Sequence, residues 1–203
     1  MEEQIEQAIA ILKKGGIVAF PTDTVYGLGA NALDDDAVTK VYRAKKRPQH
    51  LALPLLLSDI SQIASVAMDV PDMAWRLAQR FLPGGLTLVL YKASAVSSVV
   101  SGGGHTIAVR VPDHPVPIAL IKGLGAPITG TSANLSGSPS PLTAQEVYRQ
   151  MGDWVDLIID GRCPGSVDST VLDLTGDVPA VLREGAISRE EIERVCGIFR
   201  TIR

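Results

Sequence analysis

Five of the eight residues in the stretch KVYRAKKR, from 40 to 47, are lysine or arginine. The whole chain carries 19 basic and 22 acidic residues, with a formal net charge of -3, so this cluster is a local feature. A local group of cations can hold a nucleic acid, hold the phosphates of a nucleotide, or form the solvated face of a helix. The acidic balance argues against a protein that coats nucleic acid with its whole surface, but it is compatible with a basic pocket.

Two further arginines lie in apolar segments, where a charge is costly. Arg110 is inside TIAVRVP, and Arg183 is in VLREG. A buried arginine needs a partner, because an unpaired charge in the interior is strongly unfavourable. Each arginine is therefore expected either to pair with a structural carboxylate or to bind an anionic ligand, and the sequence alone does not choose between the two.

Three loops rich in hydroxyl groups adjoin apolar segments: PTDTVYGLGAN after IVAF, TGTSANLSGSPS after API, and CPGSVDST before VLDL. Serine, threonine, asparagine and glycine make turns anywhere, which would explain a single loop of this kind. Three such loops at strand ends are more typical of the rim of a shared pocket, because ligands favour those ends. Hydroxyl and backbone N–H groups there can hold phosphate, carboxylate or ribose oxygens.

The sequence lacks the signatures of common nucleotide-binding and hydrolytic enzymes. GGGH at 102–105 has no Gly-Lys-Ser/Thr ending and is expected to be a turn between strands, and neither GxSxG nor HExxH occurs. Cys163 and Cys196 are too few for a disulfide framework and have no metal-ligand spacing, so we expect buried thiols in a reducing cytoplasm. The three histidines match no metal or hydrolase pattern and are expected at the surface or in loops. No signal peptide or membrane span is expected.

The elements that must position these residues alternate between helix and strand. Apolar periodicity and end signals predict helices at 5–12, 34–46, 71–82 and 116–125, and capping boxes predict two more that begin near Thr143 and Ser188. Short apolar runs predict strands at 17–20, 53–57, 86–92, 106–112, 126–129, 155–160, 169–174 and 179–184. The last three follow one another without helices. We therefore predict one α/β domain over 1–203, with a twisted, mixed parallel and antiparallel sheet and flanking helices.

Seven motifs occur together in this order: PTDTVYGLGANAL, KxR in AKKRP, FLPGGLTLVL, TIAVRVPDHP, TSANLSG, DSTVLDL and LREGAI. In these motifs the chain resembles the YrdC/TsaC family, the L-threonylcarbamoyladenylate synthases, over about residues 5–195. The resemblance implies a YrdC-like fold with a concave substrate cavity, in the short single-domain form. It also implies a nucleotidyltransferase that condenses L-threonine, bicarbonate or CO₂ and ATP to threonylcarbamoyl-AMP and pyrophosphate.

The resemblance implies a role for each residue that matches a motif. Lys45 and Arg47 would be catalytic, reaching the triphosphate and the reacting carboxylates. The threonine side of the site would contain Thr24, Tyr26, Arg110 and Ser169. The ATP side would contain, beside Lys45 and Arg47, the residues Thr106, Ser132, Asn134, Ser140 and Arg183.

The chemistry of such a reaction agrees with these residue types. All three substrates carry an anionic group, so cations and neutral donors are needed to bring them together. No protein nucleophile is required, since positioning and charge neutralisation suffice. A divalent ion, Mg²⁺, is expected to enter with ATP and to be held by phosphates and water, without dedicated protein ligands. The implied partner is a threonylcarbamoyl transferase complex that acts on tRNA, and direct contact with tRNA is compatible with the basic cluster.

The chain departs from the family pattern directly after the KxR motif. Many members have KxRPxxNPLxxH, in which the asparagine helps to bind ATP and the histidine helps to bind threonine. Here the asparagine, proline and histidine positions hold Leu51, Ala52 and Leu56. We therefore leave these three positions out of the predicted site.

Two other functions are compatible with parts of the sequence. A module that only binds double-stranded RNA or tRNA would use spread cations and exposed aromatic residues, but aromatics are 4% of this chain and its cations coincide with hydroxyl loops. A hydrogenase-maturation enzyme that uses carbamoyl phosphate contains a related domain, together with acylphosphatase and zinc-finger modules that are absent from this sequence.

The members of the basic cluster are not expected to be equivalent. Pro48 disfavours a helical conformation at Arg47, so the backbone there is expected to be extended. Lys45 and Arg47 would then reach into one pocket while Lys46 faces away. Replacing Lys45 or Arg47 is expected to remove activity with little effect on stability.

Overall fold

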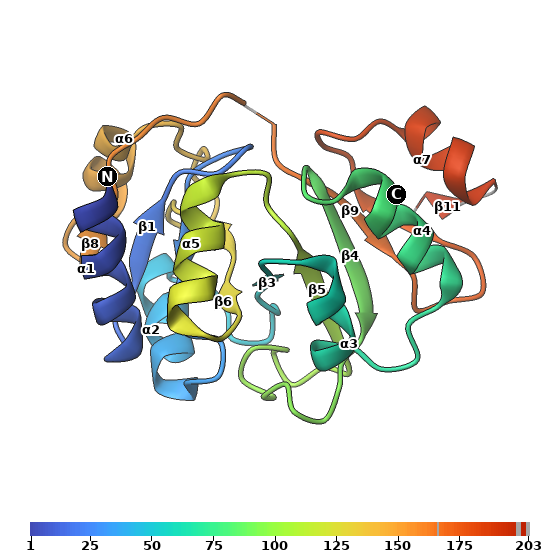
Figure 1. The fold of residues 1–203 in the computed structure, drawn as a ribbon, viewed down its shortest axis with the longest axis horizontal. Coiled ribbons are helices and arrows are strands. Elements are labelled where there is room, and N and C mark those ends of the chain that lie inside the picture. The colour runs from blue at the N-terminus through green and yellow to red at the C-terminus, as the bar shows by residue number, and fades with distance from the viewer. Residues whose placement is uncertain (166, 198–199, 202–203) are drawn as a thin grey trace.

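The strands of the computed structural model form two sheets, which lie side by side in Figure 1. The structure describes residues 1–165, 167–197 and 200–201. The smaller sheet has the strand order β7-β2-β1-β8. The pairs β2–β7 and β1–β2 are antiparallel, and the pair β1–β8 is parallel. Its strands are β1 (Val18–Phe20), β2 (Gly27–Gly29), β7 (Thr131–Ser132) and β8 (Leu157–Ile158).

The larger sheet has the strand order β11-β10-β9-β4-β5-β3-β6. The pairs β10–β11, β4–β9 and β3–β5 are parallel, and the pairs β9–β10, β4–β5 and β3–β6 are antiparallel. Its strands are β3 (Leu55–Leu56), β4 (Leu86–Tyr91), β5 (Thr106–Arg110), β6 (Ile128–Thr129), β9 (Thr170–Asp173), β10 (Ala180–Arg183) and β11 (Arg200–Thr201). The predicted mixed α/β fold is confirmed, and its strands are divided between two sheets.

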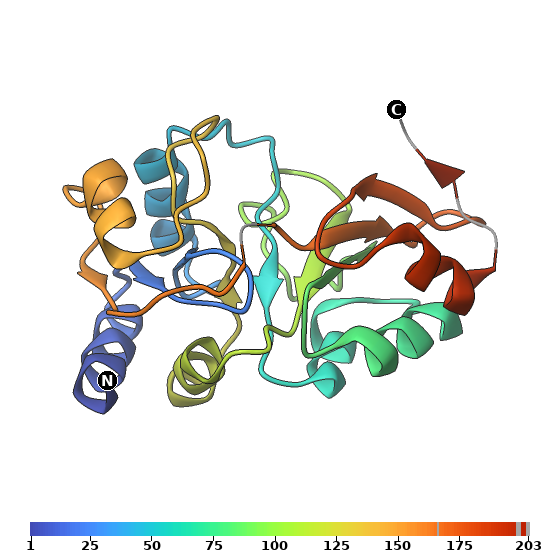
Figure 2. The same ribbon diagram turned by 90° about the horizontal axis from the view of Figure 1, so that it is seen from above.

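The helices gather in two groups beside these sheets. Figures 1 and 2 show α1, α2, α5 and α6 around the smaller sheet, and α4 and α7 together beside the larger one. The helices are α1 (Glu2–Lys13), α2 (Asp35–Lys45), α3 (Ile63–Val66), α4 (Asp72–Phe81), α5 (Pro115–Leu124), α6 (Ala144–Met151) and α7 (Arg189–Cys196), and a 3₁₀ turn, η1 (Ile60–Gln62), leads into α3. Both predicted capping boxes, Thr143 with Glu146 and Ser188 with Glu191, are confirmed. Within the described residues, no helix has the length and apolar character needed to cross a membrane.

Two buried clusters form the core. The larger contains apolar side chains from both sheets and from α2, α4 and α6. The second lies between α1, α5 and β1 and includes Leu12, Phe20, Leu120 and Ile159. Leu56 of β3 belongs to this second cluster and also reaches the pocket described below.

The chain passes from one sheet to the other at Gly130, which separates β6 from β7. A side chain cannot be added there without displacing Leu56, because a Cβ on Gly130 would lie 2.3 Å from the Leu56 Cγ. The Gly130 N–H donates to the Pro54 carbonyl at 2.8 Å. The two sheets therefore meet where β3 packs directly on the backbone at Gly130.

The end of α2 differs from the expected extended backbone. Lys45 is the last helical residue, and Lys46 adopts a left-handed conformation with φ of 50°. The Lys46 N–H donates to the Arg43 carbonyl and the Arg47 N–H to the Tyr42 carbonyl, which is the Schellman arrangement. Lys46 is exposed, as predicted, but it is turned away by this helix ending and not by alternation along a strand.

Candidate functional site

A pocket of about 290 Å³ lies between the two sheets. Its floor is one face of the larger sheet: Leu56, Ala108, Thr87, Val171 and Arg183 come from five adjacent strands, β3, β5, β4, β9 and β10. Its opposite wall comes from the smaller sheet and the loop before it. That wall and the rim contain Thr22, Thr24, Val25, Tyr26, Gly27, Arg47, Gly130, Thr131, Ser132, Asp168 and Ser169.

Arg110 is fixed at the end of β5 by three hydrogen bonds. Its Nη2 donates to Asp23 Oδ1 at 2.6 Å, its Nη1 to Thr24 Oγ1 at 2.9 Å, and its Nε to the Gly84 carbonyl at 2.9 Å. The sequence left open whether this arginine pairs with a carboxylate or faces a ligand. The structure shows that it pairs with Asp23 and also lines the pocket. A second N–H on each of Nη1 and Nη2 remains available for an anion.

Two pairs of hydroxyl groups lie in the walls. Thr22 Oγ1 donates to the Val25 carbonyl at 2.7 Å, so the 3.1 Å contact between Thr22 and Thr24 must use the Thr24 hydrogen. The Thr24 oxygen, which also accepts from Arg110, is then left as an acceptor toward the pocket. In the second pair, Thr87 Oγ1 and Ser169 Oγ are 2.7 Å apart. One hydrogen of that pair is free to donate to a ligand.

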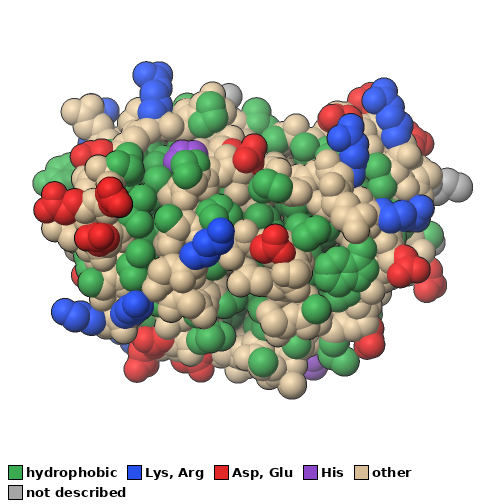
Figure 3. All heavy atoms as spheres, in the orientation of Figure 1, with side chains coloured by type: hydrophobic (Ala, Val, Ile, Leu, Met, Phe, Trp, Pro, Cys, Tyr) green, Lys and Arg blue, Asp and Glu red, His purple; other side chains and the backbone are tan. Residues whose placement is uncertain are grey.

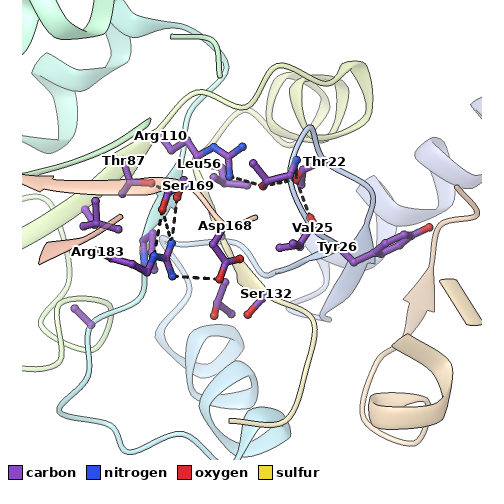
Figure 4. A pocket seen from close by; sticks show the side chains of 18 of the residues that line it. Thr22, Val25, Tyr26, Leu56, Thr87, Arg110, Ser132, Asp168, Ser169 and Arg183 are labelled. Atoms are coloured by element: carbon purple, nitrogen blue, oxygen red, sulfur yellow. Dashed lines mark hydrogen bonds and ion pairs between the residues drawn. The ribbon is translucent and has the colours of Figure 1, made fainter. Parts of the chain in front are cut away.

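Arg183 and Asp168 form a half-exposed pair on the side of the larger sheet. Arg183 Nη1 lies 3.5 Å from Asp168 Oδ2, while its Nε and Nη2 donate to the Ser169 carbonyl at 3.2 and 2.9 Å. Figure 4 shows both side chains at the pocket, with Asp168 between Arg183 and Ser132. Arg183 therefore faces the pocket with its guanidinium already oriented by a backbone carbonyl.

Lys45 is buried behind the pocket wall. Its ammonium donates to the Ser132 carbonyl and to the carbonyl and side-chain oxygens of Asn134, the latter two at 2.8 and 3.3 Å. Burial, with a further contribution from the charge of Arg47, lowers the pKa of Lys45 to about 8. The Asn134 amide donates to the Leu135 and Ser138 carbonyls. Lys45 and Asn134 thus shape the loop that carries Ser132, and neither side chain lines the pocket itself.

Arg47 is the member of the basic cluster that lines the pocket. Its Nε donates to the Leu51 carbonyl at 3.1 Å and its Nη2 to the Ala52 carbonyl at 3.0 Å. These bonds hold the guanidinium beside the segment that leads into β3. Arg47 lines the pocket and Lys46 is exposed, as expected. Lys45, which was predicted to reach into the same pocket, instead donates to backbone carbonyls of the wall.

The structure brings most of the predicted site residues together. Those that line the pocket are Thr24, Tyr26, Arg47, Arg110, Ser132, Ser169 and Arg183. The hydroxyl group of Tyr26 points away from the pocket and donates to the Ile159 carbonyl at 2.8 Å. Burial raises the pKa of Tyr26, so its hydroxyl stays protonated.

Four predicted site residues lie outside the pocket lining: Lys45 and Asn134, described above, and Thr106 and Ser140. Thr106 is the first residue of β5 and Arg110 the last, so roughly 13 Å of strand separates them. Ser140 lies beyond Ser132 in a loop that leads away toward α6. The structure therefore does not bring Thr106 or Ser140 to the pocket, because motif membership does not specify which end of an element faces the ligand.

Sequence reasoning missed several residues of the site. Asp23, Thr87 and Asp168 all lie within the quoted motifs PTDTVYG, FLPGGLTLVL and DSTVLDL, but none was assigned a role. The signal for Thr87 was a lone hydroxyl between Leu86 and Leu88 in an otherwise apolar strand. Leu56, set aside as a departure from the family pattern, lies in the pocket on Gly130.

The charged surface gives no sign of a large nucleic-acid interface on the face in Figure 3. Among the described residues drawn there, acidic and basic side chains both occur, mainly toward the edges of the view, and no large basic patch is seen. The cations that converge are those of the pocket, Arg47, Arg110 and Arg183. Chemistry on a small anionic ligand is thus the use that this arrangement favours.

A family model described as "Telomere recombination", that of the Sua5, YciO and YrdC proteins, matches residues 10–185. The chain belongs to the Sua5/YciO/YrdC family. The resemblance drawn from the seven motifs is therefore confirmed at the level of the family, and the fold expected from it is confirmed by solved structures of family members.

Members of the Sua5/YciO/YrdC family share both sequence and fold with this chain. The threonylcarbamoyl-AMP synthase of Bacillus subtilis (strain 168) is 48% identical over 198 residues, which are 97% of this chain and 57% of that protein. The crystal structure of P. abyssi Sua5 complexed with L-threonine matches with a TM-score of 0.97 and 44% identity, over 100% of this chain and 60% of that one. The crystal structure of E. coli YciO matches with a TM-score of 0.86 and 33% identity, over 95% and 94%.

This chain spans about 57–60% of the length of the B. subtilis and P. abyssi relatives. The shared part contains all the pocket residues, because the family match extends from residue 10 to residue 185. The family includes proteins named threonylcarbamoyl-AMP synthase and E. coli YciO, which is named uncharacterized.

Proposed function

We propose that this chain is an L-threonylcarbamoyladenylate synthase. It would condense L-threonine, bicarbonate or CO₂ and ATP to threonylcarbamoyl-AMP and pyrophosphate. The product would pass to a threonylcarbamoyl transferase complex that modifies tRNA, and the cytoplasmic location expected from the sequence accompanies this role. Relatives named for this product and a matching structure titled as an L-threonine complex support the proposal.

The observation that carries the proposal is the combination of charges in one pocket. Arg47, Arg110 and Arg183 converge on a space whose remaining polar lining is made mainly of hydroxyl groups. Three anionic reactants must be held close together in this reaction, and three cations with neutral donors meet that need. The walls hold no serine or cysteine paired with a base among their described residues, in keeping with a reaction that needs no covalent enzyme intermediate.

The residues would act by holding and orienting the reactants. Arg110, fixed by Asp23, would bind the threonine carboxylate, with the Thr24 oxygen as a nearby acceptor. The amine adds to CO₂ and releases a proton, which gives a carbamate. A carbamate oxygen then attacks the α-phosphate, and the bond to the pyrophosphate leaving group breaks. Arg47 and Arg183 would offset the negative charge that develops at the phosphates.

We also propose that Mg²⁺ enters with ATP. The described residues contain no group of three or more His, Cys, Asp or Glu side chains that could hold a metal ion. Such an ion would therefore be carried by phosphate oxygens and water, a coordination that Mg²⁺ accepts readily. When bound, it would neutralise phosphate charge beside Arg47.

The test is to incubate the purified chain with ATP, bicarbonate and each amino acid in turn, and to measure pyrophosphate and the adenylate product. We expect pyrophosphate only when threonine and bicarbonate are both present, together with a product of the mass of threonylcarbamoyl-AMP. Pyrophosphate release that ignores threonine or bicarbonate would contradict the proposal, and so would binding of tRNA without any turnover of ATP.

A further inference from the structure

Asp168 is the carboxylate that lines the pocket among the described residues, beside three arginines. Its negative charge is unexpected in a site for anionic reactants, so it calls for a specific use. Arg110 does not need it, because Arg110 is already paired with Asp23 at 2.6 Å. Asp168 is therefore not needed to neutralise Arg110, and its charge can serve another group.

The Asp168 carboxylate has acceptor capacity left over. Its ion pair with Arg183 Nη1 is 3.5 Å long, beyond the usual range of an N–H···O hydrogen bond. Arg183 directs its closer nitrogens to the Ser169 carbonyl. Because an ionised carboxylate has about four acceptor positions, Asp168 presents most of them to the pocket, as far as the described residues show.

The backbone fixes where this carboxylate stands. The Asp168 carbonyl accepts from the Ala186 N–H at 2.9 Å, and the Gly185 backbone packs so closely that a Cβ there would lie 2.2 Å from the same oxygen. The next residue, Ser169, is held by Thr87 and Arg183. Asp168 is thus a charge held at a defined place in the wall.

The acceptors in the pocket suit an ammonium group better than a metal ion. A divalent cation wants several anionic oxygens, and the described residues offer no cluster of three metal-ligating side chains. An ammonium group brings three N–H donors and needs one counter-charge with neutral acceptors. The carboxylate of Asp168 supplies the counter-charge, and the remaining lone pair of Thr24 Oγ1 supplies a neutral acceptor.

We propose that Asp168 binds the α-ammonium group of the amino acid substrate. The inference rests on the proposed function and extends it: the site would select for a free α-amino group as well as for a carboxylate. Arg110 ends β5, and Asp168 lies just before β9, with β4 between these strands. The registers place Val171 level with Arg110 and Asp168 three residues before it, so the two backbones are roughly 14 Å apart. The Arg110 side chain spans part of this distance, because its Nε donates to the Gly84 carbonyl. Between the two side chains there is room for the oppositely charged groups of one α-amino acid.

The experiment compares Asp168→Asn with the wild-type chain in calorimetric titrations of L-threonine and of (R)-3-hydroxybutyrate, which is threonine without its amino group. We expect the variant to bind L-threonine about tenfold or more weakly, because a charge-assisted bond to the ammonium is lost. Binding of (R)-3-hydroxybutyrate should be the same in both proteins. Asp177→Asn, an exposed aspartate outside the pocket, is the matched control and should bind both ligands as the wild type does.

Each other outcome overturns the assignment in a distinguishable way. Equal weakening of both ligands would mean that Asp168 acts by orienting Arg183. Mg²⁺-ATP is titrated into both proteins as well, and a loss confined to Mg²⁺-ATP binding would place Asp168 with the nucleotide. Unchanged threonine binding in Asp168→Asn would show that the carboxylate has no contact with the amino acid. Failure of the wild-type chain to bind any amino acid would instead refute the proposed function, and this assignment with it.

Discussion

The Lys45 ammonium donates hydrogen bonds to the backbone carbonyls of Ser132 and Asn134, and so joins the end of α2 to the loop that forms one wall of the pocket. Lys45 is 2% exposed. A lysine so deeply buried chiefly fixes the backbone of the loop to which it is hydrogen-bonded. It does not contact the ligand space directly. The sequence-based expectation that Lys45 could be replaced without loss of stability is therefore revised.

Replacing Lys45 with methionine should destabilise the chain. The substitution keeps an unbranched side chain but leaves buried carbonyl oxygens without their donor, which costs about 1–3 kcal/mol. For a chain of this size that is a fall in Tm of roughly 2–10 °C. Thermal melts of Lys45→Met should be compared with those of Lys46→Met, which alters the exposed neighbour and should melt like the wild type. Equal Tm values for the two variants would mean that Lys45 does not hold the loop.

The stability contributed by Lys45 should depend on pH. Burial lowers its pKa from 10.5 to about 8 in the folded chain. Below pH 8 both states are protonated and the folded state carries the full cost of the buried charge. As pH rises from 8 to 10.5 the folded state loses its proton first, so the unfolded state binds more protons and the free energy of unfolding rises.

The measurement for this pH effect is urea unfolding of wild type and Lys45→Met between pH 7.5 and 9.5. The difference between the two proteins isolates Lys45 from other titrating groups. We expect the wild type to gain stability relative to the variant across this window, by up to about 2 kcal/mol. A difference that is constant with pH would indicate that Lys45 keeps an ordinary pKa.

Arg110 should determine affinity for threonine rather than for ATP. Arg110→Ala removes the guanidinium and leaves Asp23 unpaired, so we expect KM for threonine to rise about 10- to 100-fold, with a much smaller change for ATP. Steady-state kinetics with each substrate varied in turn checks this. A folded Arg110→Ala protein with an unchanged dependence on threonine would show that the Asp23–Arg110 pair is purely structural.

Arg47 and Lys46 are adjacent cations with different environments, which makes them a matched pair. Arg47→Ala should remove most pyrophosphate formation because it takes a charge from the pocket, whereas Lys46→Ala should retain nearly full activity. Equal losses at the two positions would contradict the pocket assignment. If the cluster served nucleic acid instead, each substitution would weaken tRNA binding by a similar, salt-dependent amount.

Most of the helices and strands could be predicted from periodicity and end signals. Thr143 and Ser188 start their helices as their capping boxes indicate. The ending of α2 could not be predicted, because the left-handed position after a helix is usually glycine and here is Lys46. Strands β2 and β7 were also missed, since they lie inside loops whose glycine and hydroxyl residues are typical of turns.

The sequence was informative about the candidate site where a residue type carries its own energetic cost. A cation in an apolar strand, as at Arg110, is informative because burial demands a partner. Thr106 could not be placed in this way. It is at the end of β5 that lies away from the pocket, and only tertiary packing determines which end of the strand faces the smaller sheet. Asp168 was missed because a carboxylate in a predicted loop is ordinarily explained by exposure to solvent.

The hydroxyl pair of Thr87 and Ser169 joins residues 82 positions apart in the chain, and the contact of Arg110 with Thr24 spans 86. Both contacts close long loops, and the pocket that they support is complete only in the native state. A ligand that binds the finished pocket can then stabilise only the native side of the folding barrier. Threonine and ATP should lengthen the lifetime of the folded chain against unfolding while leaving its rate of refolding unchanged.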